Sequence, residues 1–237
     1  MTMNSEKLVR LERMGLGPVW QLRARADKPV AVVDATEAVA LDAADFSGLD
    51  WEELEATIRE CARCGLCRGR THAVSGIGDR HASWLFVGEG PGRSEDLEGE
   101  PFVGPAGQLL DNMLKAMQLA RGVDTFIANI VKCRPVDADG RDRPPVHNEV
   151  AACRAFLQRQ IDLIKPTVIV ALGKTAATSL LGLNEETSLS SLRGEPHSYR
   201  GIPVVVTYHP AYLLRKPEDK AKSWRDLCLA QSLHDER

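Results

Sequence analysis

The sequence predicts an α/β fold in which helices cover both faces of a mainly parallel sheet. Short apolar runs of strand length alternate along the chain with longer segments that have helical periodicity. The clearest run, residues 167–172, is almost wholly apolar, which is typical of a strand buried on both faces. We therefore expect a three-layer α/β/α sandwich, preceded by an N-terminal extension.

The regular pattern begins near residue 50. Asp50 is placed to cap a helix that ends at Glu60. Residues 83–87 are mostly apolar and are followed by a glycine, as expected of a buried strand. An amphipathic helix is expected over residues 106–119 and a second strand over residues 124–131.

The second half of the chain continues the alternation. We expect a helix over residues 149–164, the strand over residues 167–172, a helix that starts at Gly173, and a last strand over residues 202–207. In parallel sheets, ligands bind at the carboxyl ends of the strands. The residues that directly follow each strand are therefore the ones to examine for chemistry.

The first part of the chain differs in charge from the rest. Residues 1–60 carry 12 Asp and Glu against 7 Lys and Arg, whereas the remainder carries 21 against 23. We expect residues 1–50 to be a poorly ordered extension and residues 51–237 to be the folded domain. A slightly basic body permits nucleic-acid binding but does not require it.

The N-terminus lacks the basic-then-apolar pattern of a signal peptide, and no apolar run is long enough to span a bilayer. We therefore expect a cytoplasmic protein, associated with the nucleoid in a prokaryote, whose thiols are kept reduced. Disulfides then explain the six cysteines poorly, and metal ligation explains them better.

Four cysteines have the spacing of a metal site, because one pair is separated by two residues and two more lie far along the chain. These four are Cys61, Cys64, Cys133 and Cys153. Their occupant is either an iron–sulfur cluster or zinc. Spacing alone also allows Cys67 as a ligand, but we interpret it and Cys228 as buried structural thiols.

Polar residues follow three of the expected strands. Glu89 and Glu95 follow the first strand in a glycine-rich segment, Asn129 lies at the end of the second, and His209 follows the last. Carboxylates, an amide and an imidazole at one edge of a sheet can polarise water, read an amide edge and stabilise a developing negative charge.

Two nucleotide-binding patterns are incomplete. The glycines from Gly88 to Gly92 resemble a dinucleotide fingerprint, but its third glycine is replaced by Arg93. The tripeptide Gly173-Lys174-Thr175 resembles the end of a phosphate-binding loop, but its leading glycine is replaced by Val168. We expect no nucleotide cofactor.

Six motifs occur together in a specific order. They are Cys61-x-x-Cys64, Gly88 to Gly92 with Glu95-Asp96, Pro101 to Gly107, Asn129 to Pro135, Leu192-Arg193-Gly194, and His209 to Arg215. With these motifs, the chain from about residue 57 to its C-terminus resembles the family-4 uracil-DNA glycosylases, the iron–sulfur members of the uracil-DNA glycosylase superfamily.

This resemblance implies a monofunctional DNA glycosylase for base excision repair, which flips uracil out of single- or double-stranded DNA and hydrolyses its N-glycosidic bond. We expect a monomer that needs no membrane. Phe102 matches the ring that stacks on uracil, Asn129 the amide that reads its edge, and His209 the imidazole near O2. An ordinary core phenylalanine and a strand-end turn residue are the competing interpretations of the first two.

The resemblance also implies that Glu89 or Glu95 activates water or offsets positive charge on the sugar. The family usually has an aspartate where this chain has Glu89, so which glutamate acts is left open. Gly88 and Gly90 would let the backbone approach the extruded nucleotide closely.

On the DNA side, the resemblance places Arg193 and Arg215 near phosphates and Leu213 in the gap that the flipped base leaves. A leucine packed at the start of a helix is the competing interpretation of Leu213. Among the cysteines, the four named above match the ligands of a [4Fe–4S] cluster with a structural role, and Cys67 matches a position that is not a ligand.

Three other functions compete. A subgroup of the superfamily traps uracil covalently through a histidine that follows a basic run, but His147 follows no such run here. A non-catalytic DNA-binding or polymerase-associated iron–sulfur protein would not need Glu89, Asn129 and His209 together. An electron-transfer protein leaves the His209 motif unexplained.

Overall fold

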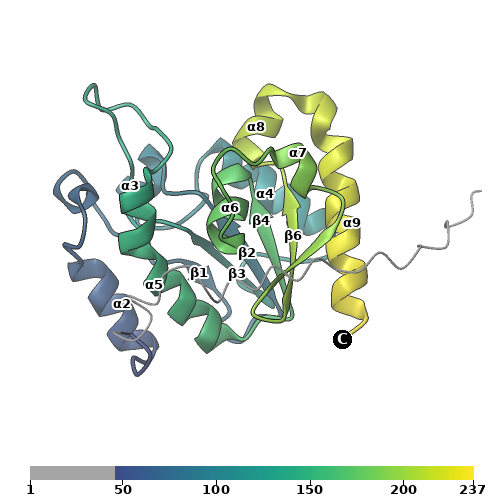
Figure 1. Ribbon diagram of the computed structural model, residues 1–237, viewed down its shortest axis with the longest axis horizontal. Helices are drawn as coiled ribbons and strands as arrows, with labels where there is room; N and C mark the ends of the chain where they lie inside the picture. Colours follow the sequence, from purple (N-terminus) through teal and green to yellow (C-terminus); the bar gives the residue numbers. More distant parts are fainter. Residues whose placement is uncertain (1–45) are drawn as a thin grey trace, which may run out of the picture. The chain divides into compact units, whose positions relative to one another are not determined.

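The computed structural model describes residues 46–237. The first 45 residues, and with them most of the expected extension, lie outside the described part. Six strands form one sheet in the order β1-β3-β2-β4-β6-β5 (Figure 1). The strands are β1 (Ile77–Gly78), β2 (Trp84–Gly88), β3 (Thr125–Asn129), β4 (Val168–Leu172), β5 (Pro196–Tyr199) and β6 (Ile202–Thr207).

Helices connect these strands along the chain. They are α2 (Trp51–Glu60), α3 (Arg93–Glu98), α4 (Pro105–Ala116), α5 (His147–Ile164), α6 (Lys174–Leu181), α7 (Leu189–Leu192), α8 (Pro210–Arg215) and α9 (Lys220–Asp235), with short 3-10 helices η2 (Gly65–Arg68) and η3 (Pro217–Asp219). Among residues 46–237, no helix combines the length and the apolar character that crossing a membrane requires.

The four inner strands are parallel. β2 pairs with β3 and with β4, and β4 pairs with β6, so the carboxyl ends of all four lie at one edge. The mainly parallel sheet is therefore confirmed. The outer strands β1 and β5 are antiparallel to their neighbours and were not expected from the sequence.

Helices cover both faces of the sheet, which confirms the three layers. In β2, Leu85 and Val87 point to a core that α2, α5 and α6 complete, whereas Trp84 and Phe86 point to a core completed by α4 and α9. All residues of β2, β3 and β4 are buried, because each strand is covered on both sides.

The packed region includes residues before Asp50. The ring of Phe46 is buried and stacks on Phe156 of α5, with the ring centroids 4.6 Å apart. The carbonyl of Leu49 accepts hydrogen bonds from Arg159. Asp50 caps α2 as expected, in a capping box with Glu53. The boundary expected at residue 50 therefore falls inside packed structure.

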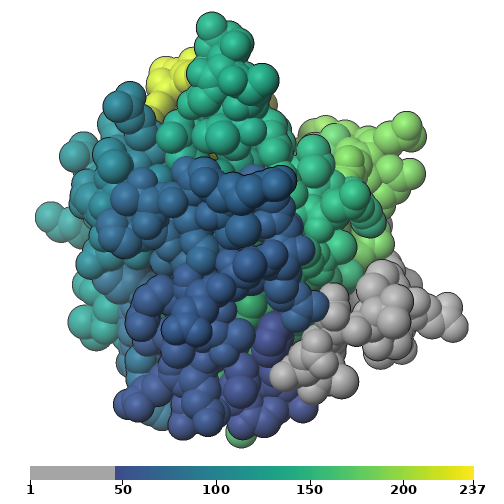
Figure 2. All heavy atoms as spheres, turned by 90° about the vertical axis from the view of Figure 1, so that its left-hand side faces the viewer, coloured from purple at the N-terminus to yellow at the C-terminus, as the bar shows by residue number. Residues whose placement is uncertain are grey.

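A loop between β3 and α5 stands out from the body (Figures 1 and 2). Its residues 137–142 are exposed. The loop is fixed at its base, because Arg143 donates two hydrogen bonds of 2.6 and 2.8 Å to Glu149 in the first turn of α5. This pairing with Arg143 lowers the pKa of Glu149. The base of the loop is thereby held at the carboxyl edge of the sheet.

Gly107→Ala tests the packing of α4 against the segment that carries Phe102. A Cβ at Gly107 would overlap the carbonyl oxygen of Phe102. Alanine inside a helix normally stabilises by about 0.5–1 kcal/mol, but overpacking costs about 1–3 kcal/mol, so we expect net destabilisation in urea unfolding. Gly48→Ala, where a Cβ meets nothing within 4 Å, is the control. Unchanged stability of Gly107→Ala would contradict this packing.

Candidate functional site

A cavity of about 660 Å³ lies at the carboxyl edge of the sheet, lined by the segments that follow β2, β3 and β6. It brings together most residues that the sequence singled out, namely Glu89, Gly90, Glu95, Phe102, Asn129, His209 and Arg215. They meet because parallel strands deliver their following residues to one edge. Pro135 and the base of the exposed loop, at Asp142 to Pro144, complete the wall.

Asn129 presents an unsatisfied polar atom to this cavity. It is the last residue of β3 and is 2% exposed. Within residues 46–237, its Oδ1 is the buried side-chain oxygen or nitrogen that has no hydrogen-bond partner. Leaving a buried acceptor unpaired costs about 1–3 kcal/mol. Such an atom in a cavity indicates a ligand that donates a hydrogen bond to it.

Gly88 makes room for this amide and for the ring of Phe102. Gly88 lies beside Asn129 in the register of the sheet. A Cβ at Gly88 would overlap Asn129 Oδ1 and would come 2.6 Å from Cζ of Phe102. The amide and the ring can therefore lie together only because residue 88 has no side chain.

Phe102 is held in an unusual backbone conformation, with φ of 57°. A left-handed conformation costs about 1–2 kcal/mol for a residue with a Cβ, so neighbouring contacts must hold it. Arg121 supplies them, donating to the carbonyls of Pro101 and Phe102 at 2.9 and 2.8 Å. Strain of this kind is characteristic of functional segments.

His209 stands directly before α8, and its tautomer follows from its contacts. Its Nδ1 accepts a hydrogen bond of 3.2 Å from the N–H of Ala211. Burial, reinforced by the charge of Arg215, lowers its pKa to about 4. The neutral ring therefore carries its proton on Nε2 and is a hydrogen-bond donor there. It stacks near Phe102, with the ring centroids 5.5 Å apart.

The two glutamates reach the cavity from different elements. Glu89 follows β2 and accepts a hydrogen bond from the hydroxyl of Thr175 in α6, whereas Glu95 lies in the first turn of α3. Sequence reasoning missed Thr175, although it too follows a strand of the same edge. Asp96 has a different role, because its buried carboxylate accepts the backbone N–H of Thr71 at 2.9 Å.

Two of the residues expected at the DNA surface are enclosed in the protein. Leu213 is 1% exposed and therefore packs inside, whereas its neighbour Leu214 is 46% exposed. The side chain of Arg193 is 10% exposed and pairs with the buried Asp226 at 2.7 Å. These placements correct the expectations for Leu213 and Arg193. Arg215 is exposed and lines the cavity.

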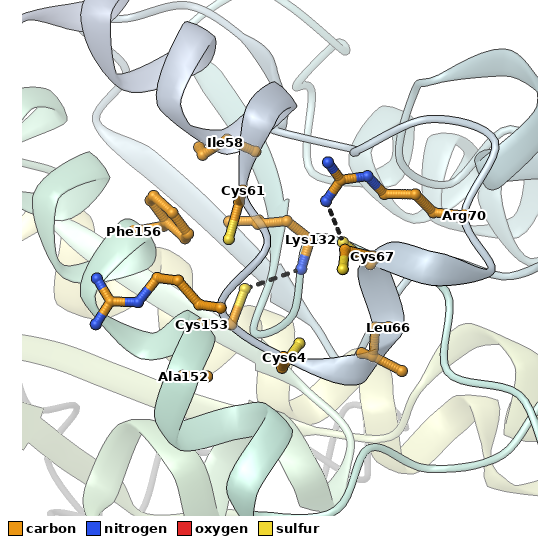
Figure 3. Close-up of a pocket in the computed structure, with 12 residues that line it drawn as sticks. Ile58, Cys61, Cys64, Leu66, Cys67, Arg70, Lys132, Ala152, Cys153 and Phe156 are labelled. Carbon is orange, nitrogen blue, oxygen red and sulfur yellow. Dashed lines mark hydrogen bonds between the residues drawn. The ribbon is translucent and has the colours of Figure 1, made fainter.

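A second cavity lies where the cysteines gather. The lining includes Cys61, Cys64 and Cys67 from the segment after α2, Cys133 from the segment after β3, and Cys153 from α5. Figure 3 shows the labelled sulfur atoms turned toward a common space. The four expected ligands are thus brought together by folding, and Cys67 lies beside them.

Hydrogen-bond donors reach two of these thiols, but burial disfavours negative charge on sulfur. Arg70 donates to Cys133 Sγ at 3.1 Å, and the backbone N–H of Lys132 donates to Cys153 Sγ at 3.2 Å. Burial raises the pKa of Cys153 to about 12 and raises the pKa of Cys133 and Cys64 as well. A thiolate there therefore requires a compensating cation, as a metal site supplies.

Lys132 connects the cysteine cavity to Asn129. Its side chain is 1% exposed, and Nζ donates to the Asn129 carbonyl at 2.8 Å and to Gln160 Oε1 at 2.7 Å. Burial lowers the pKa of Lys132 to about 8. Lys132 lies within the Asn129 to Pro135 motif, but no sequence pattern gave it or Gln160 a role, because the two meet only in the fold.

Cys67 and Cys228 are more exposed than expected, and His147 lies outside the main cavity. Cys228 is exposed and Cys67 is half-buried, so the interpretation of both as buried structural thiols is wrong. His147 is exposed and lines a separate cavity of about 430 Å³ between α5 and α6.

Comparison with known proteins agrees with this arrangement. The family model described as the uracil DNA glycosylase superfamily matches residues 75–230. The chain belongs to this superfamily. The match contains the residues of the main cavity, from Glu89 to Arg215. It begins after the Cys61 and Cys64 pair, so those two ligand candidates lie outside it.

Named members of the superfamily resemble the chain over most of its length. It is 41% identical to the type-4 uracil-DNA glycosylase of Archaeoglobus fulgidus over 70% of this chain and 86% of that protein. The type-4 enzyme of Pyrobaculum aerophilum is 40% identical over 76% of this chain and 93% of its own. The type-4 enzyme of Thermotoga maritima is 41% identical over 72% of this chain and 86% of that protein. The chain is therefore a type-4 member of the superfamily.

The protonation state of His209 can be tested directly. An NMR titration is expected to give a pKa of about 4, below the ordinary 6.5. The pKa of His209 is near the ordinary 6.5 in the unfolded chain and about 4 in the folded protein. The free energy of unfolding therefore decreases as the pH falls from 6.5 to about 4. Arg215→Met is expected to raise the pKa of His209, though not to its ordinary value, because burial is the larger cause. Titration of His209 near its ordinary pKa would refute the neutral donor.

Proposed function

We propose that this protein is a monofunctional uracil-DNA glycosylase, which flips uracil out of single- or double-stranded DNA and hydrolyses its N-glycosidic bond. One observation carries the proposal: the buried Oδ1 of Asn129 has no partner in a cavity that also holds an aromatic ring and a neutral imidazole. Membership of the superfamily and the names of the type-4 relatives support the same activity.

The base is read by Asn129 and Phe102. Uracil presents an N3–H donor beside the O4 acceptor, and an asparagine amide offers an acceptor and a donor in the complementary order. Oδ1 accepts the N3–H and gains the partner that it otherwise lacks. Cytosine has an acceptor at N3, so it would face Oδ1 unfavourably. The ring of Phe102 stacks on the extruded base above Gly88 and Gly90.

Bond cleavage is assisted by His209 and a glutamate. As the glycosidic bond breaks, its electron pair leaves with uracil, and the Nε2–H of neutral His209 donates to the charge that builds on O2. Water adds to C1′ of the sugar and gives its proton to a carboxylate. Glu89, which is fixed by Thr175, and Glu95 are the carboxylates for this step and for the positive charge on the sugar.

The cysteine cavity fits a [4Fe–4S] cluster held by Cys61, Cys64, Cys133 and Cys153. Four thiols from three separate segments and two hydrogen-bond donors to sulfur support this assignment. The same four thiolates could bind zinc, and the resemblance to the iron–sulfur family-4 enzymes favours the cluster. It would cross-link these segments.

Arg215 and Leu214 are the side chains that we propose to face DNA. The exposed Arg215 at the mouth of the cavity is suited to a DNA phosphate, and Leu214 replaces Leu213 as the side chain that fills the gap in the duplex. We propose a monomer that acts in the cytoplasm on nucleoid DNA. In it, residues 51–237 form the glycosylase domain and residues 1–50 an extension, whose Phe46 and Leu49 pack on α5 of that domain.

An assay on oligonucleotides with a single uracil opposite guanine, opposite adenine or unpaired tests the function, with abasic sites revealed by alkaline cleavage. We expect cleavage by the unmodified protein and a loss of about 10²–10³ in rate for His209→Ala, as for other donors to a developing negative charge. Asn129→Ala is expected to lose activity as well. His81→Ala and Asn112→Ala, at exposed sites, are the matched controls. Absence of cleavage by protein with its cluster would favour a non-catalytic DNA-binding role.

Chemical analysis tests the cofactor. Purified protein is expected to contain iron and acid-labile sulfide in equal amounts and no stoichiometric zinc. Cys153→Ser is expected to lose both and to unfold at lower temperature, because it removes a ligand from a buried site. Cys228→Ser, at the exposed cysteine of α9, should retain them. Zinc in place of iron would overturn the assignment.

A further inference from the structure

Arg193 belongs to a motif that the proposed chemistry does not use, and its contacts lie inside the protein. Its Nε and Nη2 bond Asp226 Oδ2 of α9 at 2.8 and 2.7 Å, and Asp226 is 2% exposed. The guanidinium also lies over the ring of Tyr208, with Cζ 4.0 Å from the ring centroid. Arg193 is thus held between an acidic partner and an aromatic ring, a geometry that its planar fork suits and a lysine cannot reproduce.

These contacts fix the chain on both sides of His209. Directly before it, the ring of Tyr208 lies under Arg193, and the hydroxyl of Thr207 donates to the same Asp226 at 2.8 Å. One turn after it, Tyr212 stacks on Tyr208 with ring centroids 4.7 Å apart and donates to Asp219 at 2.7 Å. The segment that presents the imidazole is therefore attached to α9 and η3 through a stack that Arg193 closes.

We propose that Arg193 is a positioning residue for His209, which it serves by linking the ring of Tyr208 to Asp226 of α9. The inference rests on the proposed function, in which Nε2 of His209 must face O2 of uracil. The bond from Ala211 to Nδ1 sets the tautomer, but the direction of the ring depends on the backbone of residues 207–212. A displacement of about 1 Å in a catalytic group can cost about 10²-fold in rate.

The competing role is contact with a DNA phosphate, and the two roles predict opposite results. A phosphate contact contributes about 0.9 to the slope of log affinity against log salt concentration on duplex DNA. Lysine also replaces arginine well at a phosphate, but poorly where the guanidinium stacks and forms two bonds. Arg215, which is exposed at the cavity, is the matched arginine for comparison.

The experiment uses the full-length protein with its cluster. Single-turnover cleavage is measured at saturating uracil oligonucleotide, and affinity for a duplex with a stable abasic analogue is measured over a series of salt concentrations. For Arg193→Met and Arg193→Lys, we expect cleavage about 10²-fold slower with an unchanged salt slope. For Arg215→Met, we expect the slope to fall by about 0.9.

A single substitution of Arg193 leaves the buried charge of Asp226 unpaired, and such a variant can unfold. The double variant Arg193→Met/Asp226→Asn removes that charge and is therefore measured as well. Its melting midpoint must lie above the assay temperature. NMR signals of the His209 ring give a second readout, and we expect them to shift in this double variant.

The outcomes separate the inference from the function. The positioning role would be overturned if Arg193→Lys cleaved at the wild-type rate, or if Arg193→Met reduced the salt slope. It would also be overturned if the double variant left both the cleavage rate and the His209 signals unchanged. Absence of cleavage by the wild-type protein would refute the glycosylase instead, while the His209 signals would still report whether Arg193 orients the ring.

Discussion

The close approach of three residues at the end of β2 is the constraint on which the main cavity depends. Gly88 has no side chain, and the space is taken by the amide of Asn129 and the ring of Phe102. The supports around them follow from this contact. Arg121 holds Phe102 in a conformation that it would not adopt alone, and Gly107 lets α4 pack against the same segment. Helix α4 thus helps to shape the main cavity, whose lining includes its Pro105 and Ala106.

The two cavities share a short piece of chain. Residues 129–133 contain the amide that faces one cavity and a thiol that faces the other, and Lys132 bonds to the backbone of Asn129 from within the core. A shift of this segment would therefore alter the lining of both cavities. A single residue also serves two contacts beside β6. There, Asp226 of α9 accepts from Thr207, which precedes His209, and pairs with Arg193.

Much of the fold and of the rim was predictable because its signal is local. Residues 202–207 form a strand with the expected bounds, and Asn129 and His209 lie where their strands end. Other features have no local signal. β1 has two residues and β5 begins with a proline, so neither has an apolar run. Leu213 and Leu214 are identical in type, and only tertiary packing decides which is buried. Thr175 and Lys132 gained their roles from partners on other elements.

The exposed loop at residues 137–142 has a consequence for how the chain is held together. It separates Cys133 from Cys153 along the backbone, while Cys61 and Cys64 lie on the side of Cys133. Four thiolates on one cluster would therefore link the two sides of that loop independently of the peptide backbone. If the backbone were cut once in this loop, the cluster would still join the fragment that carries Cys133 to the fragment that carries Cys153. Removal of the iron would release that link.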